Sequence, residues 1–304
     1  MNPNNSRRGD GKMKQVDVAG IRASSRPAGK RVGGTIGIFL FLTAIGVFMA
    51  VPIYLMLLMS VKPAEELFVF PPKFYVMRPT FVNFTDMFAK IRQNQVPFSR
   101  YIFNSVFVTA SVTFLQCAFV SMAAFVLAKF RFPLSRFING CIVVALLYQS
   151  NVIYIMQYIV MAKLNMINDP SALILPAVAS PIGLFLMKQS ISQLPDEMIE
   201  AAKMDGAGLF RICWQIVIPN MKPAFMTLMI FAFQASWNIR SGSLIFDEQY
   251  KTLQTVVEQA ASSGMATAGI AMAAAVFVLI PPVIVFILAQ RQVIETMAHS
   301  GIKE

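Results

Sequence analysis

Residues 200–219 read EAAKMDGAGLFRICWQIVIP, a charged and small-residue stretch that separates two strongly apolar blocks of the chain. Pro195 stands just ahead of it, where proline suits the first turn of a helix, and Asp196 and Glu197 follow where the positive end of a helix dipole favours acids. Gly206 can adopt the positive φ that ends a helix. Beyond this glycine, apolar residues recur at helical spacing, at Leu209, Ile212, Cys213, Ile216 and Val217. The stretch predicts two short helices that meet at Gly206 and end at Pro219.

The flanking blocks have the composition of a membrane protein. Apolar residues make up 56% of the 304 residues and charged residues only 13%, and the mean hydropathy is +0.61. Four charge-free runs reach the length of about 20 residues that crosses a bilayer: 35–60, 101–128, 137–162 and 267–290. Two shorter runs, 171–187 and 223–239, lie at the low end of the range. The sequence therefore predicts an all-α polytopic membrane protein with six transmembrane helices and a helix-turn-helix loop, residues 191–222.

Lysine and arginine are distributed unevenly, and the side rich in them is expected to be cytosolic. The first 31 residues hold eight of the 26. With six spans both termini are then cytosolic, and 17 of the 26 basic residues fall inside. We expect residues 1–31 to form a flexible basic cytosolic tail and residues 32–304 a six-span membrane domain. The net charge of +11 is explained by basic flanks beside anionic membrane lipid, so nucleic acid is not an expected partner.

The helical loop between the fourth and fifth predicted spans has a plain interpretation. Any cytosolic loop of a transporter can be helical, and an amphipathic helix often lies on the bilayer surface. The spacing of the apolar residues alone does not favour docking of the loop on another protein over this plain interpretation.

The loop resembles the EAA loop of permease subunits from type I ATP-binding-cassette importers. That motif consists of E-A-A, three residues, Gly, nine residues and I-x-L-P. The matching residues here are Glu200, Ala201, Ala202, Asp205, Gly206, Ala207, Ile216 and Pro219. Ile218 stands where the family usually has Leu, which is an apolar exchange. The motif is specific because it lies between the fourth and fifth of six predicted spans, on the inner side.

Other stretches resemble carbohydrate-uptake permeases similar to the maltose importer, so the resemblance covers most of the chain. They are Asn104-Ser105, LAKFRFPLSR (127–136), LPDEMIEAA (194–202), Trp237-Asn238 and QRQVIETMAHSGIK (290–303). Within that group the chain resembles the subunit with six spans and a short C-terminal tail. Glu304 departs from the Gly commonly seen at the end, so no contact between the tail and an ATPase is inferred.

The resemblance implies that the loop is a coupling helix, which docks in a cleft of a cytosolic ATPase subunit. The ATPase-coupling residues would be Glu200, Ala201, Ala202, Asp205, Gly206, Ala207 and Pro219. The two acids can accept charge-assisted hydrogen bonds, the alanines permit close approach, and the glycine sets the angle between the helices. The resemblance further implies a homologous second permease subunit, two cytosolic ATPase subunits, an extracytoplasmic solute-binding protein and a bacterial cytoplasmic membrane.

Polar side chains inside the predicted spans are candidates for the substrate pathway, because such groups avoid lipid. The resemblance favours Gln234, Trp237 and Asn238; Asn104, Gln149, Asn151 and Gln157 also qualify. An aromatic ring beside amides can stack on a sugar and hydrogen-bond it. Each of these groups can instead bond a neighbouring helix, which is the more frequent role. Oligosaccharides are the first substrates expected, with glycerol phosphate esters or modified sugars as alternatives.

Two other classes of membrane protein fit the sequence less well. An ion-coupled secondary transporter usually places ionisable residues at membrane depth, and no predicted span contains Asp, Glu, Lys or His. A membrane enzyme lacks candidate groups, because the sole histidine, His299, lies near the C-terminus and the spans hold no acidic pair. The sequence has no G-x-x-x-x-G-K-[ST] loop, so we expect no cofactor here and ATP held by partner subunits. The three cysteines lack paired spacing, and no metal site is expected.

Overall fold

The computed structural model contains helices and no strand in the part of the chain that it describes. That part is residues 32–301 without residues 68, 70, 72, 93–94, 148–149 and 263–266. The predicted basic tail, residues 1–31, lies outside the described residues. The chain divides into two compact units, Met1–Val51 and Pro52–Glu304, and each is considered by itself.

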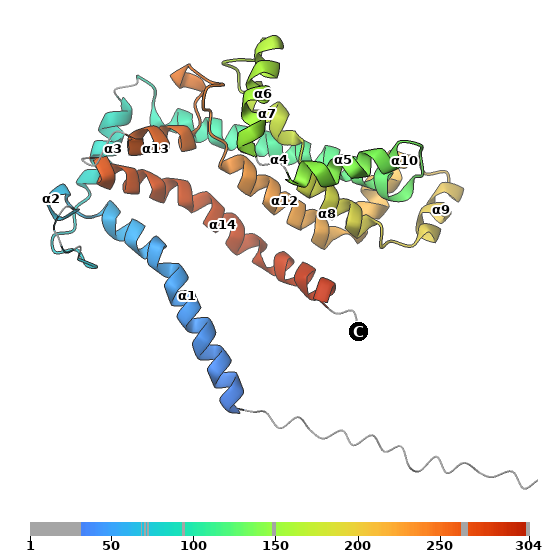
Figure 1. Cartoon of the computed structure of the whole chain (residues 1–304), viewed down its shortest axis with the longest axis horizontal. Coiled ribbons are helices and arrows are strands. Elements are labelled where there is room, and N and C mark those ends of the chain that lie inside the picture. The colour runs from blue at the N-terminus through green and yellow to red at the C-terminus, as the bar shows by residue number, and fades with distance from the viewer. Residues whose placement is uncertain are drawn as a thin grey trace, which may run out of the picture. The chain divides into compact units, whose positions relative to one another are not determined.

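The helices follow one another in the order labelled in Figure 1. They are α1 (Val32–Ser60), α2 (Ala64–Leu67), α3 (Val82–Arg92), α4 (Phe98–Lys129), α5 (Ser135–Leu147), α6 (Ser150–Lys163), α7 (Ser171–Val178), α8 (Pro181–Ile191), α9 (Asp196–Met204), α10 (Leu209–Ile212), a π-helix (Cys213–Val217), α11 (Ile218–Asn220), α12 (Lys222–Trp237), a 3-10 turn (Glu248–Tyr250), α13 (Leu253–Ser262) and α14 (Ala268–Gly301).

In the part of the chain that the structure describes, four helical stretches are long and apolar enough to cross a membrane: Ile36–Ser60, Phe98–Lys129, Ser171–Ile191 and Ala268–Gln290. Each coincides with a predicted span. A fifth arises if Leu209–Asn220 and Lys222–Trp237, which are bent by 94°, are counted as one span. The all-helical class is thus confirmed, with four or five candidate spans.

The remaining predicted span, residues 137–162, lies within α5 and α6. These helices have 13 and 14 residues, and each alone is shorter than the roughly 20 residues that cross a bilayer. Residues 148–149, between the two helices, lie outside the described residues. A single span over 137–162 therefore stays a prediction.

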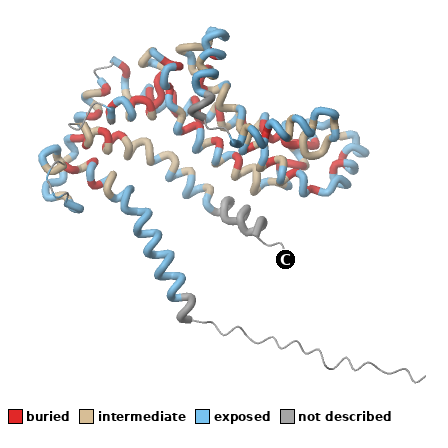
Figure 2. Tube along the Cα trace, in the orientation of Figure 1, coloured by how far each residue is buried: buried red, intermediate tan, exposed pale blue. Residues whose placement is uncertain are grey.

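Helix α4 lies at the centre of the second unit, where it packs against α12, α8, α7 and α13. Its buried residues are spread along its whole length, as the red segments of Figure 2 show. They contribute to three apolar clusters. Val120 and Phe125 pack with the α8, α9 and α12 side; Val108 and Val112 pack with α6 and α7; Tyr101 packs with α3, α13 and α14. This helix therefore joins the three parts of the core.

The stretch from α7 to α8 is interrupted at residues 179–180, just before Pro181. Pro181 begins α8, and the residue before it, Ser180, is extended, as the steric restriction ahead of proline requires. The Ser180 hydroxyl accepts a hydrogen bond from the Gly183 N–H at 3.2 Å. The serine thereby caps α8 and satisfies one of the backbone donors that the break leaves unpaired.

A buried asparagine joins the end of α1 to α3 and α14. The Asn83 side-chain amide donates to the backbone carbonyls of Ser60 and Lys62, at 2.9 and 2.7 Å. Its carboxamide lies against Gly269 of α14, where a Cβ atom would come within 2.5 Å of the Asn83 oxygen. Only a residue without a side chain fits between α14 and this amide.

Helix α9 is fastened to the C-terminal end of α4 by charge and by packing. The Lys129 ammonium donates to the Leu194 carbonyl at 2.5 Å and to the Asp196 carboxylate at 2.7 Å. Further along α9, the Lys203 ammonium lies 5.1 Å from the centre of the Phe130 ring, within cation–π range. The hydrogen bond and charge of Lys129 lower the pKa of the Asp196 carboxyl below its ordinary value of 3.8.

Replacing Gly269 with alanine should destabilise the protein. The added methyl would overlap Asn83, whose amide is held by two carbonyls, and overpacking of this kind costs about 1–3 kcal/mol. We expect a lower melting temperature in detergent, measured by loss of monodisperse protein. Gly46→Ala is the control, because no atom lies within 4 Å of its added Cβ. Equal melting temperatures for the two variants would contradict the close approach at Gly269.

Replacing Asp196 with asparagine should lower the melting temperature at neutral and mildly acidic pH but not in strong acid. A carboxyl whose pKa is depressed by folding contributes stability above its unfolded-state pKa and loses it as pH falls through the folded-state value. The gap between wild type and Asp196→Asn should stay constant down to about pH 4 and close below it. Glu197→Gln removes the neighbouring charge in the same first turn and should produce a smaller shift. A gap independent of pH would exclude the ionised carboxylate as its cause.

Candidate functional site

Residues 196–220 form a bent segment, called here the elbow. Its first part, α9, ends in a Schellman arrangement. The Ala207 N–H donates to the Ala202 carbonyl and the Gly206 N–H to the Lys203 carbonyl, both at 3.0 Å. Gly206 has φ +77°, in the left-handed region that other residues enter at a cost. The glycine thus reverses the chain after α9, and α10 begins at Leu209.

The second part of the elbow contains a π-helix, which we attribute to Pro219. Proline has no N–H to donate to the preceding turn, so regular hydrogen bonding fails there. The Asn220 side-chain amide donates to the Ile216 carbonyl at 2.6 Å, and the Met221 N–H donates to the Val217 carbonyl at 3.0 Å. Pro223, the second residue of α12, likewise has no N–H to donate. Two prolines in five residues account for the 94° bend between the elbow and α12.

One face of the elbow is buried against the helices. Its residues are Ile199, Ala202, Ile212, Cys213, Val217 and Ile218, which pack with α4, α8 and α12 in one cluster. Ala202 is 6% exposed, so its small side chain lets α9 approach the core. Ala207 is half-buried against the same cluster. Two of the alanines expected at a partner surface therefore serve internal packing.

The opposite face of the elbow is open. The exposed residues among those predicted for coupling are Glu200, Ala201, Asp205, Gly206 and Pro219. Met204, Leu209 and Phe210 lie beside the turn and are 88%, 51% and 67% exposed. Sequence reasoning did not single out this apolar tip, and it grouped Leu209 with the buried stripe. The sequence did contain a sign of this tip, because the apolar residues Met204, Leu209 and Phe210 flank the turn at Gly206.

The four residues predicted for the substrate pathway do not form one site. Asn104 is buried and donates to the carbonyls of Gln249 and Lys251, at 2.7 and 3.0 Å. Trp237 is buried, donates to the Val278 carbonyl of α14 at 3.0 Å and stacks on Phe233. Both contacts join distant segments of this chain. Gln234 and Asn238 are exposed.

Asn238 lines a polar hollow of about 780 Å³ between α6, α7 and the end of α12. The polar residues of its lining are Tyr154, Gln157, Asn238, Arg240 and Glu258. The Arg240 guanidinium pairs with the Glu258 carboxylate at 2.8 Å, and both side chains are about half exposed. The sequence placed Gln157 and Asn238 in different spans, and the structure brings them to one hollow. Tyr154 and Glu258 were missed because pairing across about 100 residues leaves no local pattern.

The wall of the hollow is fixed by hydrogen bonds to Tyr154. Its hydroxyl accepts from the Ser243 N–H at 2.9 Å and lies 3.0 Å from the Ser243 hydroxyl. In the same loop, the Ser241 N–H donates to the Thr255 hydroxyl at 2.7 Å. The hollow offers amide, hydroxyl, cationic and anionic groups, which suit a hydroxyl-rich solute. Among the described residues, no group of three His, Cys, Asp or Glu could hold a metal ion.

Residues 120–298 match the family described as "Binding-protein-dependent transport system inner membrane component". This range is more than half of the chain and runs from within α4 into α14. It contains the elbow and every lining residue of the polar hollow.

Similar proteins belong to the same class. An sn-glycerol-3-phosphate transport system permease protein, UgpE, of Yersinia enterocolitica is 32% identical over 227 residues, which cover 70% of this chain and 77% of that protein. UgpE of Escherichia coli O1:K1 is 28% identical over 254 residues, covering 82% and 90%.

A chain in the crystal structure of a bacterial ABC transporter involved in the import of the acidic polysaccharide alginate superposes with a TM-score of 0.70, over 86% of this chain and 97% of that one. At 20% identity this similarity shows the fold alone. Taken with the family match and the sequence relatives, it leads to one conclusion. The chain belongs to the family of inner membrane components of binding-protein-dependent transport systems, as a permease subunit of an ABC importer.

Proposed function

We propose that this permease subunit crosses the membrane six times with both termini cytosolic, and that its elbow receives the movement of a separate ATPase. The single observation that carries the proposal is the two-faced elbow. One face is packed against α4, α8 and α12, and the other exposes acids beside an apolar tip. In this topology α5 and α6 together form the third span, and α12 with the elbow's end forms the fifth.

The open face of the elbow has the chemistry of a docking surface. Met204, Leu209 and Phe210 would enter an apolar cleft of the ATPase, since large exposed apolar groups around a turn are suited to that role. Glu200 and Asp205 are exposed beside them and would accept charge-assisted hydrogen bonds from basic partner residues. Ala201 and Pro219 would lie in the contact. Ala202 and Ala207 support the elbow from within.

Movement of the elbow would reach the spans through fixed contacts. Lys129 ties α9 to the end of α4, and Val217 and Ile218 are buried against the core. Such contacts move packed helices together rather than bending the elbow alone. The assembly would include a second permease subunit, two cytosolic ATPase subunits and an extracytoplasmic solute-binding protein. ATP would be bound by the ATPase subunits, with no cofactor held by this chain.

We assign a hydroxyl-rich solute, a sugar, oligosaccharide or sugar-like phosphate ester, as the substrate class. The names of the relatives support it, since they concern sn-glycerol-3-phosphate and an acidic polysaccharide. The hollow at Gln157, Asn238 and Arg240 offers matching hydrogen-bonding groups. Gln234 lies one helical turn before Asn238 and would extend this surface along α12. Asn104 and Trp237 would act indirectly, by holding the segments around the pathway.

Purification of the intact complex tests the function. The subunits that accompany the chain are identified by mass spectrometry, and the complex is reconstituted in liposomes with a panel of radiolabelled sugars and phosphate esters. We expect uptake that requires ATP and the binding protein. A cysteine placed at Met204, which is 88% exposed, should cross-link to the ATPase. Uptake by this chain alone without ATP would establish secondary transport instead.

Replacing Gly206 with valine should uncouple transport. Positive φ costs a β-branched residue more than the roughly 1–2 kcal/mol of an ordinary residue, so the angle between α9 and α10 changes. We expect ATP-driven uptake to fall at least tenfold while the amount of chain in the membrane changes little. Gly208→Val is the matched control, because Gly208 has φ −68° and open space around its Cβ position. Equal loss of expression and transport would refute the coupling role of Gly206.

A further inference from the structure

An apolar groove of about 540 Å³ lies between α4, α5 and the α7–α8 stretch. Its lining is almost wholly hydrocarbon, with Val120 and Ala123 on α4, Ile138 and Ile142 on α5, and Leu175 and Leu184 on the opposite side. The groove is open, since Phe119 and Leu175 at its edge are 58% and 51% exposed. Its volume falls within the range of about 300–1,000 Å³ that is usual for ligand sites. Neither the coupling elbow nor the polar hollow uses this space.

One end of the groove is bridged by a cation. Lys188 lies one turn beyond Leu184 on α8, and its ammonium donates to the Asn139 carboxamide oxygen of α5 at 2.5 Å. Asn139 follows Ile138, so the bridge crosses the groove next to its lining residues. An ammonium has three donors, and this hydrogen bond uses one. The ion pairs found among the described residues do not include Lys188.

Basic residues gather around this end. Arg131 and Arg136 are exposed in the turn between α4 and α5 and at the start of α5, ahead of Asn139. The helices that form the groove, α4, α5, α7 and α8, contain no Asp or Glu anywhere in their sequences. Asp196, which follows α8, is paired with Lys129 and also interacts with the charge of Arg131. Lys188 and Arg136 are therefore the two cations at this end that have no carboxylate on the same helices.

From the hydrocarbon groove and its cationic end we infer that this site binds one anionic phospholipid of the cytoplasmic leaflet. An acyl chain would lie along the α4 side of the groove, and the phosphate would accept hydrogen bonds from the free donors of Lys188 and from Arg136. The inference rests on the proposed topology, which puts the ends of α4 and α8 and the start of α5 at the cytosolic surface. Basic pockets between spans on that surface bind anionic headgroups for the same electrostatic reason.

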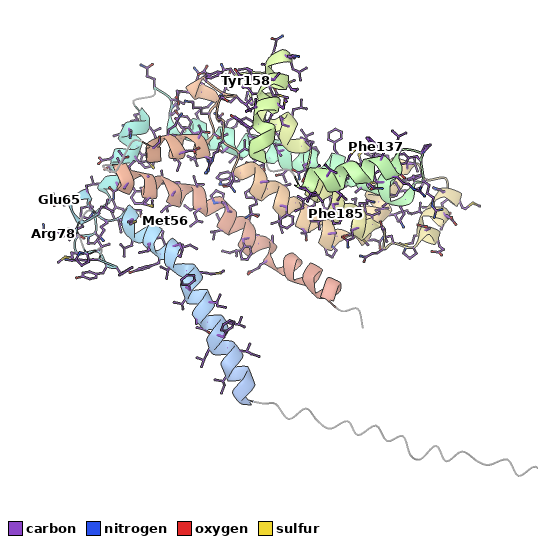
Figure 3. The ribbon with its side chains drawn as sticks, viewed as in Figure 1. Met56, Glu65, Arg78, Phe137, Tyr158 and Phe185 are labelled. Carbon is purple, nitrogen blue, oxygen red and sulfur yellow. The ribbon has the colours of Figure 1, made fainter. Side chains whose placement is uncertain are left out.

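The sides of the groove carry aromatic residues that face outward. Phe137 on α5 and Phe185 on α8, both labelled in Figure 3, are 70% and 40% exposed. Both side chains are apolar, and they lie one residue before Ile138 and one after Leu184, beside the lining of the groove. They therefore extend the hydrocarbon surface next to the groove on the side of the Lys188 bridge.

The test uses the purified complex in bilayers of phosphatidylcholine with a trace of photoreactive phosphatidylglycerol. Adducts should concentrate on peptides of α5 and α8. Unlabelled phosphatidylglycerol should compete, whereas phosphatidylcholine and inorganic phosphate should not. Lys188→Gln and Arg136→Gln should each reduce labelling about fivefold, since one cation near an anionic headgroup contributes about a factor of five. Lys222→Gln, an exposed cation at the start of α12, is the matched control and should leave labelling unchanged.

A second measurement tests whether lipid occupies the groove, through the native thiol of Cys141. Cys141 lines the groove and is exposed, while the other two cysteines are buried. Added phosphatidylglycerol should slow its alkylation by a maleimide in detergent, and Ala145→Phe, which fills the groove, should abolish both this protection and the labelling.

Labelling spread evenly over all helices, equal competition by phosphatidylcholine, or cross-linking of Cys141 to another subunit would overturn the lipid assignment. If the complex shows ATP-driven uptake but no specific labelling, the lipid inference is overturned and the proposed function stands. Failure of ATPase subunits to accompany the chain overturns the proposed function instead.

Discussion

Close packing of α4 between α8 and α12 is the constraint on which the contacts at both ends of α4 depend. At one end, Lys129 and Phe130 hold α9, so the elbow is attached to the central helix of the second unit. At the other end, the Asn104 side-chain amide donates to the backbone of residues 249 and 251. The Ser105 hydroxyl likewise accepts the Leu253 N–H at 2.7 Å. Helix α4 therefore connects the elbow with the segment before α13.

Polar groups in the spans are used mainly to tie segments of this chain together. The Trp237 indole donates to α14, and the Asn104 side-chain amide donates to the backbone of residues 249 and 251. Such hydrogen bonds replace those that lipid cannot offer. Asn238 and Arg240 are bonded nearer by, to the Gln234 carbonyl and the Glu258 carboxylate, and both line one hollow. The proposed pathway is for this reason placed beside α6, α7 and the end of α12.

Much of this fold could be predicted from the sequence because hydrophobic length and glycine or proline punctuation act locally. The runs 35–60, 101–128 and 267–290 became helices, and Gly206 adopted the positive φ expected of it. The π-helix and the exposure of Leu209 could not be predicted, since they depend on which neighbours pack against each turn. Lys129 illustrates the limit of prediction from sequence. The sequence shows only a positive charge beside an apolar run, and the pairing of Lys129 with Asp196, 67 residues later, is seen only in the structure.

The π-helix at Cys213–Val217 has a consequence for the length of the chain between Gly206 and Pro219. A π-turn holds one residue more than an α-turn, and that residue is accommodated locally rather than along the whole segment. Deleting a single residue there would rewind the turn to α-helix and leave α11 close to its present orientation, whereas a deletion from regular α-helix would rotate everything that follows by about 100°. The π-turn therefore allows one more residue between the glycine and the proline without changing the direction in which α12 leaves the elbow.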